Sequence, residues 1–255
     1  MWEDNVLFKA KSQQIEVNLE DKAALLRAVS ERFSSKQGFA LATINLDHLV
    51  KLRTSERFAK AYAEHDFVVA DGNPVVWLSK LAKRPVSLVP GSDMVVPLAR
   101  AAAEAGTSIA LFGATESSLQ AAAAALKKQI PSLDVATAIA PPMGFDASSD
   151  AAAEMLGKLE SSGAGLVFLA LTAPKQEEFA ARGRKLAPTL GFASIGAGLD
   201  FLSGEQRRAP KWARALALEW AWRMLSSPAR LGPRYIRCLA ILPSLVLEAA
   251  ALRKH

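Results

Sequence analysis

Six short apolar runs alternate with longer amphipathic or alanine-rich segments along the first 200 residues. The runs are Phe39–Ile44, Phe67–Ala70, Ser108–Gly113, Leu133–Ile139, Gly165–Leu171 and Gly191–Gly196. They are continuous and rich in Val, Ile, Leu and Phe, as expected for strands that are buried on both faces. Helical patterns lie before or between them, over Asp21–Phe33, Ser55–Glu64, Pro74–Ala82, Asp93–Ala105, Glu116–Lys128, Ala151–Ser161 and Lys175–Lys185. This order predicts an α/β fold with a mostly parallel sheet sandwiched by helices.

Two of the predicted helices carry clear start signals. Asn73 followed by Pro74 is typical of an N-cap and a first helical residue, and Thr115 is suited to cap the helix that follows it. Residues 141–150 show neither the helical nor the strand periodicity and are expected to form a loop.

The end of the chain differs from the rest in charge and in pattern. From Gln206 onward there are ten basic and two acidic residues, whereas the first 205 residues carry a net charge of −2. Three of the five tryptophans also lie there, and from about Ala209 the pattern is helical without strands. The sequence therefore predicts a Rossmann-like α/β core over residues 1–208 and a basic, all-helical appendage over 209–255. Basic residues interleaved with Trp favour an anionic partner, which is a membrane surface, a phosphate group or a nucleic acid.

Several classes of protein are excluded or disfavoured. The single cysteine, Cys238, excludes an internal disulfide framework, and the three histidines have no metal-ligand spacing with it. The start lacks the pattern of a signal peptide. The longest apolar stretch, Cys238–Leu252, contains Pro243 and Glu248 and is expected to be too short to span a bilayer. We therefore expect a cytosolic protein, or one bound peripherally to the cytosolic face of a membrane.

Polar and glycine residues follow five of the six predicted strands. Because the carboxyl ends of parallel strands meet at one edge of a sheet, where ligands bind, these residues are candidate site residues. They are Thr43, Asn45, Asp71, Asn73, Gly113, Lys175, Gln176, Glu177, Gly196 and Gly198. Each also has a structural interpretation, as a tight turn, a solvated first helical turn or a strand exit. His48, beside this edge, is more typical of a packed or surface histidine than of a catalyst.

Common nucleotide and hydrolase signatures are missing. Gly196-x-Gly198 is not followed by the third glycine of a dinucleotide-binding fingerprint, and the segment after Gly113 lacks the lysine of a P-loop. There is no G-x-S-x-G motif and no plausible Cys/His pair.

A set of motifs nevertheless resembles one known family in order and approximate spacing. The motifs are T-x-N (Thr43, Asn45), ADG (Ala70–Gly72), PG-S-D (Pro90–Asp93), PKQE (Pro174–Glu177), a GAGLDF…RAP segment (Gly196–Pro210), LEW (Leu218–Trp220) and an arginine-rich segment (Arg223–Tyr235). Together they resemble the WecG/TagA/CpsF glycosyltransferases, glycosyltransferase family 26. The resemblance extends from about Ala42 to Arg237.

The resemblance implies an inverting transfer of a sugar from a UDP-sugar to a polyprenyl-diphosphate-linked saccharide, with no metal and no cofactor. It implies that Asp71 is the general base and that Thr43 and Gln176 line the pocket. It further implies that an appendage with Arg208, Arg223, Arg230 and Arg234 closes over the site and contacts the membrane. An apolar tail can also bury itself in a second subunit, so a homo-oligomer is an alternative to membrane binding of the tail.

The chemistry of the residues agrees with these implications. An inverting transfer needs one base to take the proton of the acceptor hydroxyl, and a carboxylate at a strand end is suited to this. Arginine can bind the leaving diphosphate through its planar fork. One departure concerns the segment Ser87–Pro90, which lacks the arginine that many members carry there, so the donor need not be the family's best-known N-acetylmannosamine type.

Two other classes compete with this interpretation. A nucleic-acid-binding module would use the basic tail, but no helix-turn-helix, RNA-recognition or zinc signature supports it, and we expect no nucleic-acid partner. A nucleotide-cofactor enzyme such as a reductase is disfavoured by the missing glycine fingerprint.

Overall fold

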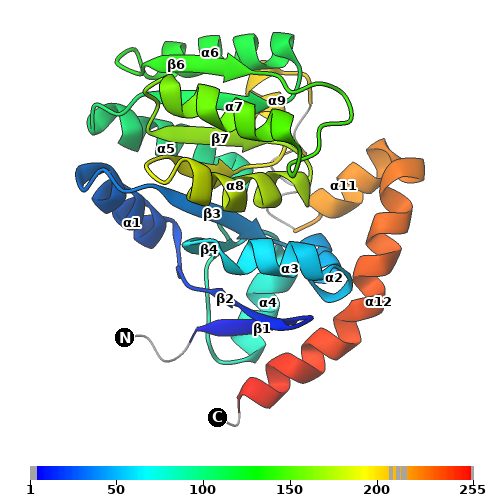
Figure 1. Ribbon diagram of the computed structural model, residues 1–255. Helices are drawn as coiled ribbons and strands as arrows, with labels where there is room; N and C mark the ends of the chain where they lie inside the picture. Colours follow the sequence, from blue (N-terminus) through cyan, green and yellow to red (C-terminus); the bar gives the residue numbers. More distant parts are fainter. Residues whose placement is uncertain (1–4, 207–208, 211–212, 214–216, 254–255) are drawn as a thin grey trace.

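A six-stranded sheet forms the centre of the computed structural model, which describes residues 5–206, 209–210, 213 and 217–253 (Figure 1). Its order is β4-β3-β8-β7-β5-β6, and each of these strands runs parallel to its neighbours. The strands are β3 (Phe39–Ile44), β4 (Phe67–Ala70), β5 (Ile109–Gly113), β6 (Val135–Ile139), β7 (Leu166–Ala170) and β8 (Gly191–Ser194). The predicted α/β fold and parallel sheet are thus confirmed.

Both faces of the sheet are covered, as the continuous apolar runs require. In β3, Phe39 and Leu41 pack on one face, whereas Ala40 and Ala42 pack on the other. The first face is covered by α1 (Lys22–Ser34), α5 (Gly91–Glu104), α6 (Glu116–Gln129) and α9 (Gly198–Ser203). The second is covered by α2 (Leu46–Thr54), α3 (Glu56–Ala63), α4 (Asn73–Leu81), α7 (Asp150–Ser161) and α8 (Lys175–Leu186). Successive side chains of a strand therefore pack into two separate apolar layers, one on each face of the sheet.

Four elements lie outside the sequence-based predictions. Strands β1 (Val6–Ala10) and β2 (Gln13–Val17) form an antiparallel hairpin that packs on the second face, and α2 and α9 are additional helices. The hairpin strands are short and half-exposed, and α2 and α9 have nine and six residues, so none produces a long periodic signal.

The helix-start signals are confirmed in one case and wrong in the other. Thr115 caps α6, because its Oγ1 accepts the N–H of Ser118 at 3.2 Å. The N-cap of α4, however, is Gly72, and Asn73 is already helical. Gly72 has φ = +104°, a conformation that a residue without a side chain adopts at little cost, so the chain turns into the helix one residue earlier.

Helices α11 and α12 follow the α/β core, and no strand occurs in the described part of the chain after β8. Their bounds are Glu219–Ser226 for α11 and Pro228–Leu252 for α12, and α12 continues through Pro233 and Pro243. By length and composition alone, Leu231–Leu252 could cross a membrane. The expectation considered only Cys238–Leu252, and the apolar helical segment is longer than expected because α12 begins earlier. A proline removes one hydrogen bond from a helix and bends it, but it does not have to end it.

The C-terminal half of α12 packs against the core (Figure 1). Leu245 and Ala249 are buried against the cluster that holds the hairpin and α2 to α4. Arg53 on α2 binds both carboxylate oxygens of Glu248, at 2.8 and 2.9 Å. Other apolar side chains of α12, among them Leu239 and Leu247, are exposed. The helix is therefore anchored along one face and apolar on the other.

Candidate active site

A cavity of about 910 Å³ lies at the carboxyl edge of the sheet. In Figure 1 the strands of the six-stranded sheet point toward the side of the molecule where α11 and α12 lie. Residues of α11 and α12 also line the cavity. Its walls include residues that follow β3, β4, β7 and β8. In the centre of the sheet β3 is paired with β8, and the chain leaves β3 into α2 but leaves β8 into α9, on the other face. Ligands of open parallel sheets bind at such a point of divergence.

Asp71 lies on the cavity wall directly after β4. Its backbone N–H donates to the carbonyl of Ile44 at 2.7 Å, which ties it to the neighbouring strand. Gly72 follows on the same wall, and it has no side chain that would block an approaching substrate. A carboxylate is thus held at a strand end beside open space.

Thr43, near the end of β3, and Asn45, directly after it, line the cavity, and each also has a structural contact. The hydroxyl of Thr43 is buried and donates to the carbonyl of Ser194 at 3.4 Å, which links β3 to β8. The Oδ1 of Asn45 accepts the N–H of His48 at 3.1 Å and caps α2. Both interpretations of these residues, structural cap and pocket wall, therefore hold at once.

Gln176 belongs to the cavity wall, whereas its neighbour Glu177 is sealed behind it. The side-chain Nε2 of Gln176 donates to Oε1 of Glu177 at 2.7 Å, and its Oε1 accepts the N–H of Gly196 at 3.2 Å. Gly196 also lines the cavity and has φ = +55°. The start of α8 is thereby joined to the exit of β8.

A charged cluster lies where α12 meets α2. Asp47 forms ion pairs with Lys51 and with Arg234, whose Nε lies 3.3 Å from Oδ1 of Asp47. All three residues line the cavity. Burial by itself would raise the pKa of Asp47, but Arg234 and Lys51 outweigh it and hold the pKa below its ordinary value. Asp47 is therefore an anion, and it holds two cations on the cavity wall.

The structure brings most, but not all, of the sequence-predicted residues to the cavity. Those on its wall are Thr43, Asn45, Asp71, Asn73, Gln176, Gly196 and Arg234; those that do not line it are Gly113, Lys175, Glu177 and Gly198. Arg208 lies outside the described residues. Arg223 belongs to α11 and Arg230 to α12, but the structure does not describe their side chains.

Two of the glycines away from the wall are explained by packing. A Cβ on Gly113 would lie 2.4 Å from the carbonyl oxygen of Ala170, and φ is +113°. A Cβ on Gly198 would lie 2.7 Å from Cγ2 of Val95. Both positions need a residue without a side chain because neighbouring elements pack too closely for one.

Other cavity residues are not among those predictions. Lys51, Trp77 and Arg237 line the cavity, together with Asp47 and His48, which the sequence places near this edge without a role. The order T-x-N-x-D-H directly after a buried strand is a signal for Asp47 and His48. Trp77 lies one turn after the start of α4, and only the packing of α12 brings Arg237 to the same space.

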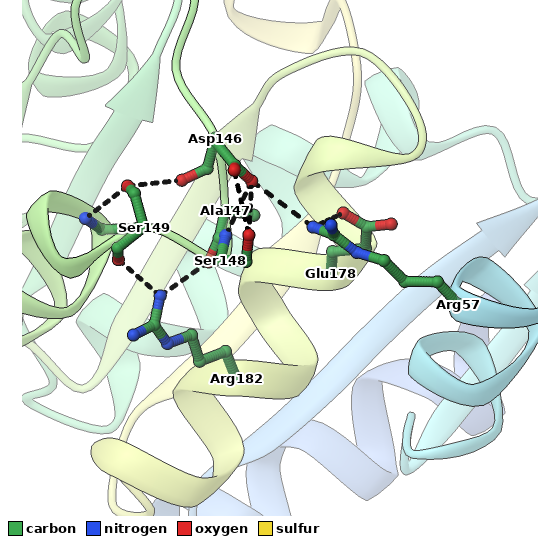
Figure 2. Close-up of polar contacts among 8 residues, drawn as sticks. Arg57, Asp146, Ala147, Ser148, Ser149, Glu178 and Arg182 are labelled. Carbon is green, nitrogen blue, oxygen red and sulfur yellow. Dashed lines mark hydrogen bonds and ion pairs between the residues drawn. The ribbon is translucent and has the colours of Figure 1, made fainter.

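A second polar cluster lies elsewhere, on the helices of the second face (Figure 2). Arg57 on α3 pairs with Glu178 on α8 and with Asp146 at 3.4 Å, while Arg182 donates to the carbonyl of Ser149 at 2.6 Å. These contacts fasten the predicted loop over 141–150 to α3 and α8. The charged side chains that line the adjacent depression of about 230 Å³ already have partners in the protein, so the larger cavity is the better candidate site.

Among the described residues, no group of three or more His, Cys, Asp or Glu side chains is placed to hold a metal ion. The polar groups that line the cavity are carboxylates, amides and cations, and its carboxylates are Asp47, Asp71, Asp200 and Glu219.

Comparisons with known proteins agree with the motifs. A family model described as the glycosyl transferase WecG/TagA/CpsF family matches residues 12–255. The N-acetylglucosaminyldiphosphoundecaprenol N-acetyl-beta-D-mannosaminyltransferase of Bacillus spizizenii is 28% identical to this chain over 226 residues, which cover 86% of this chain and 83% of that protein. The family match includes the α/β core as well as α11 and α12, so it extends over both sides of the cavity.

Proposed function

Because this chain belongs to the WecG/TagA/CpsF family of glycosyl transferases, we propose that it transfers a sugar from a UDP-sugar to a polyprenyl-diphosphate-linked saccharide. The transfer inverts the anomeric carbon, needs no metal, and serves the synthesis of a bacterial cell-surface or extracellular polysaccharide. The name of the Bacillus relative, which specifies an N-acetylmannosaminyl donor group and a diphosphoundecaprenol-linked acceptor, supports this substrate class. The donor sugar stays open, since Ser87–Pro90 contains no basic residue.

The observation that carries the proposal is that Asp71 and two arginines line opposite sides of one cavity. Asp71 lies on the sheet side, and Arg234 and Arg237 lie on the α12 side of the same space. Asp71 takes the proton of the acceptor hydroxyl as the oxygen attacks the anomeric carbon. The negative charge that develops on the leaving diphosphate is stabilised by the cations, because guanidinium groups bind phosphate oxygens in pairs.

The same appendage is suited to a membrane surface. Trp220 and Trp222 on α11 and Leu239 and Leu247 on α12 are exposed, and the tail carries an excess of basic residues. Exposed aromatic and aliphatic groups beside cations are typical of interfacial helices. The contacts of Glu248 and Leu245 hold α12 on the core, which favours peripheral binding over a spanning orientation. We place the protein on the cytosolic face of the membrane that holds its acceptor.

The test is a panel of nucleotide sugars with purified protein, anionic liposomes and a short polyprenyl-diphosphate acceptor, with and without EDTA. We expect transfer from one UDP-sugar that EDTA does not reduce. Asp71→Asn should lower kcat by about a hundredfold or more, because general-base catalysis contributes on that order. Asp150→Asn, the same change at an exposed position on α7, is the matched control.

Two outcomes would contradict the proposal. Full turnover by Asp71→Asn would remove the base assignment. The lack of any nucleotide-sugar binding, combined with salt-sensitive DNA binding, would favour the nucleic-acid interpretation of the basic tail.

A further inference from the structure

Glu177 is a carboxyl group with no solvent exposure, one residue away from the cavity wall. Its role follows from the orientation of Gln176. The backbone N–H of Gly196 can only donate, so the carboxamide oxygen of Gln176 must face Gly196. The NH₂ group of Gln176 must then face Glu177, whose Oε1 lies 2.7 Å away. Glu177 is therefore the acceptor that fixes the orientation of this carboxamide.

The surroundings of Glu177 favour its uncharged form. The nearest basic group is His48, whose Nε2 lies 3.8 Å from Oε1, and the other ring nitrogen of His48 contacts the hydroxyl of Tyr62 at 3.2 Å. Burial lowers the pKa of His48 to about 3, so this ring is neutral at physiological pH. Among the described residues, Oε2 of Glu177 has no hydrogen-bond partner. A full negative charge would thus lie next to a neutral ring, without a cation in contact.

The ionisable groups around this carboxyl act in opposite directions. Burial raises the pKa of Glu177 to about 7, against the hydrogen bond from Gln176, and Lys51 on α2 lowers it while Glu178 on its own helix raises it. Burial, followed by the charge of Glu177, raises the pKa of Tyr62 on α3 well above its ordinary range, so the phenol is neutral. Glu177 is thus the group in this cluster that titrates near neutral pH.

We propose that Glu177 is a positioning residue of the sugar-transfer site: as an uncharged carboxyl group, it holds the carboxamide of Gln176, and through it the exit of β8 at Gly196, in the geometry that meets the donor. This inference rests on the proposed function. Among the described residues, no acceptor is found for the second N–H of Gln176 Nε2, and Gln176 lines the cavity, so that N–H is available to the substrate. Ionisation of Glu177 places a negative charge behind a wall that faces a diphosphate and weakens its binding.

Two variants separate this role from a merely structural one. Glu177→Gln keeps an oxygen acceptor for Gln176 without a charge, whereas Glu177→Leu removes the acceptor. Glu178→Gln is the matched control, because it makes the same chemical change one residue later, where the side chain pairs with Arg57 instead. The kcat and KM for the accepted UDP-sugar are measured from about pH 5.5 to pH 8.5.

We expect Glu177→Leu to raise KM by about tenfold, in the range of a lost hydrogen bond, with a smaller change in kcat. The wild-type KM should rise above about pH 7, and Glu177→Gln should abolish that rise while Glu178→Gln keeps it. Wild-type KM for Glu177→Leu, or an unchanged pH profile for Glu177→Gln, would overturn the proposal. If Glu177→Leu does not fold, the pH profile of Glu177→Gln decides alone.

A second measurement does not depend on the reaction. In protein labelled with ¹⁵N-glutamine, the side-chain amide signal of Gln176 is identified by its loss in Gln176→Glu. We expect this signal to be protected from solvent exchange in the wild type and shifted in Glu177→Leu. Exchange as fast as that of exposed glutamines would overturn the positioning role even if sugar transfer occurs. Protection together with a failed donor panel would refute the proposed function, and with it the role of Glu177 in sugar transfer. The contact between Gln176 and Glu177 would still be confirmed.

Discussion

Replacing Glu177 with Gln should change how the stability of the protein depends on pH. Burial raises the pKa of Glu177 from an ordinary 4.5 to about 7 in the folded protein. Between these two values the folded protein holds a proton that the unfolded chain has already lost, so the free energy of unfolding falls as the pH rises. Above about pH 7 both states are ionised and the loss is complete.

The magnitude follows from the shift. A displacement of one pKa unit corresponds to about 1.4 kcal/mol, so the loss from Glu177 across this range approaches about 3 kcal/mol. Glu177→Gln cannot ionise and escapes the loss. The free energy of unfolding of the variant, minus that of the wild type, should therefore increase by up to about 3 kcal/mol between about pH 4.5 and pH 7.5.

Urea titrations of both proteins at several pH values measure this difference. The wild-type curve alone is not sufficient, because two buried neutral histidines act in the opposite direction. Burial lowers the pKa of His48 to about 3 and that of His65 to about 4, so both make the folded protein more stable as the pH rises toward 6.5. They are present in both proteins, and the subtraction isolates Glu177. A difference that stays constant across the range, or that decreases with pH, would refute the reasoning.

Three further predictions concern stability. Leu245→Ala should weaken the packing of α12 on the core by about 2 to 5 kcal/mol, because the Leu245 side chain is 1% exposed. Limited proteolysis should then cleave α12 faster in the variant, while the core stays resistant. Gly113→Ala should destabilise the protein by more than about 1 kcal/mol in urea unfolding, since its Cβ would lie 2.4 Å from a backbone oxygen at φ = +113°; an unchanged midpoint would disprove the packing role. Asn45→Ala should cost about 1 kcal/mol through loss of the α2 cap, and Asn45→Asp should recover most of it.

Much of the candidate site could be predicted from the sequence because strand ends are local features. Asp71 and Asn45 follow apolar runs that have to be buried, and parallel strands bring such positions to one edge whatever the rest of the chain does. The corrections also have local causes. Gly72 caps α4 in place of Asn73 because of a backbone angle. Helix α12 is longer than the apolar stretch because it begins before that stretch, at Pro228, and continues through Pro233.

The sequence by itself determined the class of fold, the edge of the sheet that carries the candidate site and the family of the enzyme. Only the tertiary structure decided which side chain at that edge faces the cavity and which faces the interior. Gln176 and Glu177 are adjacent polar residues, yet one lines the cavity and the other is sealed behind it, because their directions depend on how α8 packs against α3 and β8. Likewise Asp47 and Arg234 are distant in the chain, and their ion pair exists because α12 folds back over the sheet edge. Contacts of this kind depend on packing between remote elements, and no local pattern encodes them.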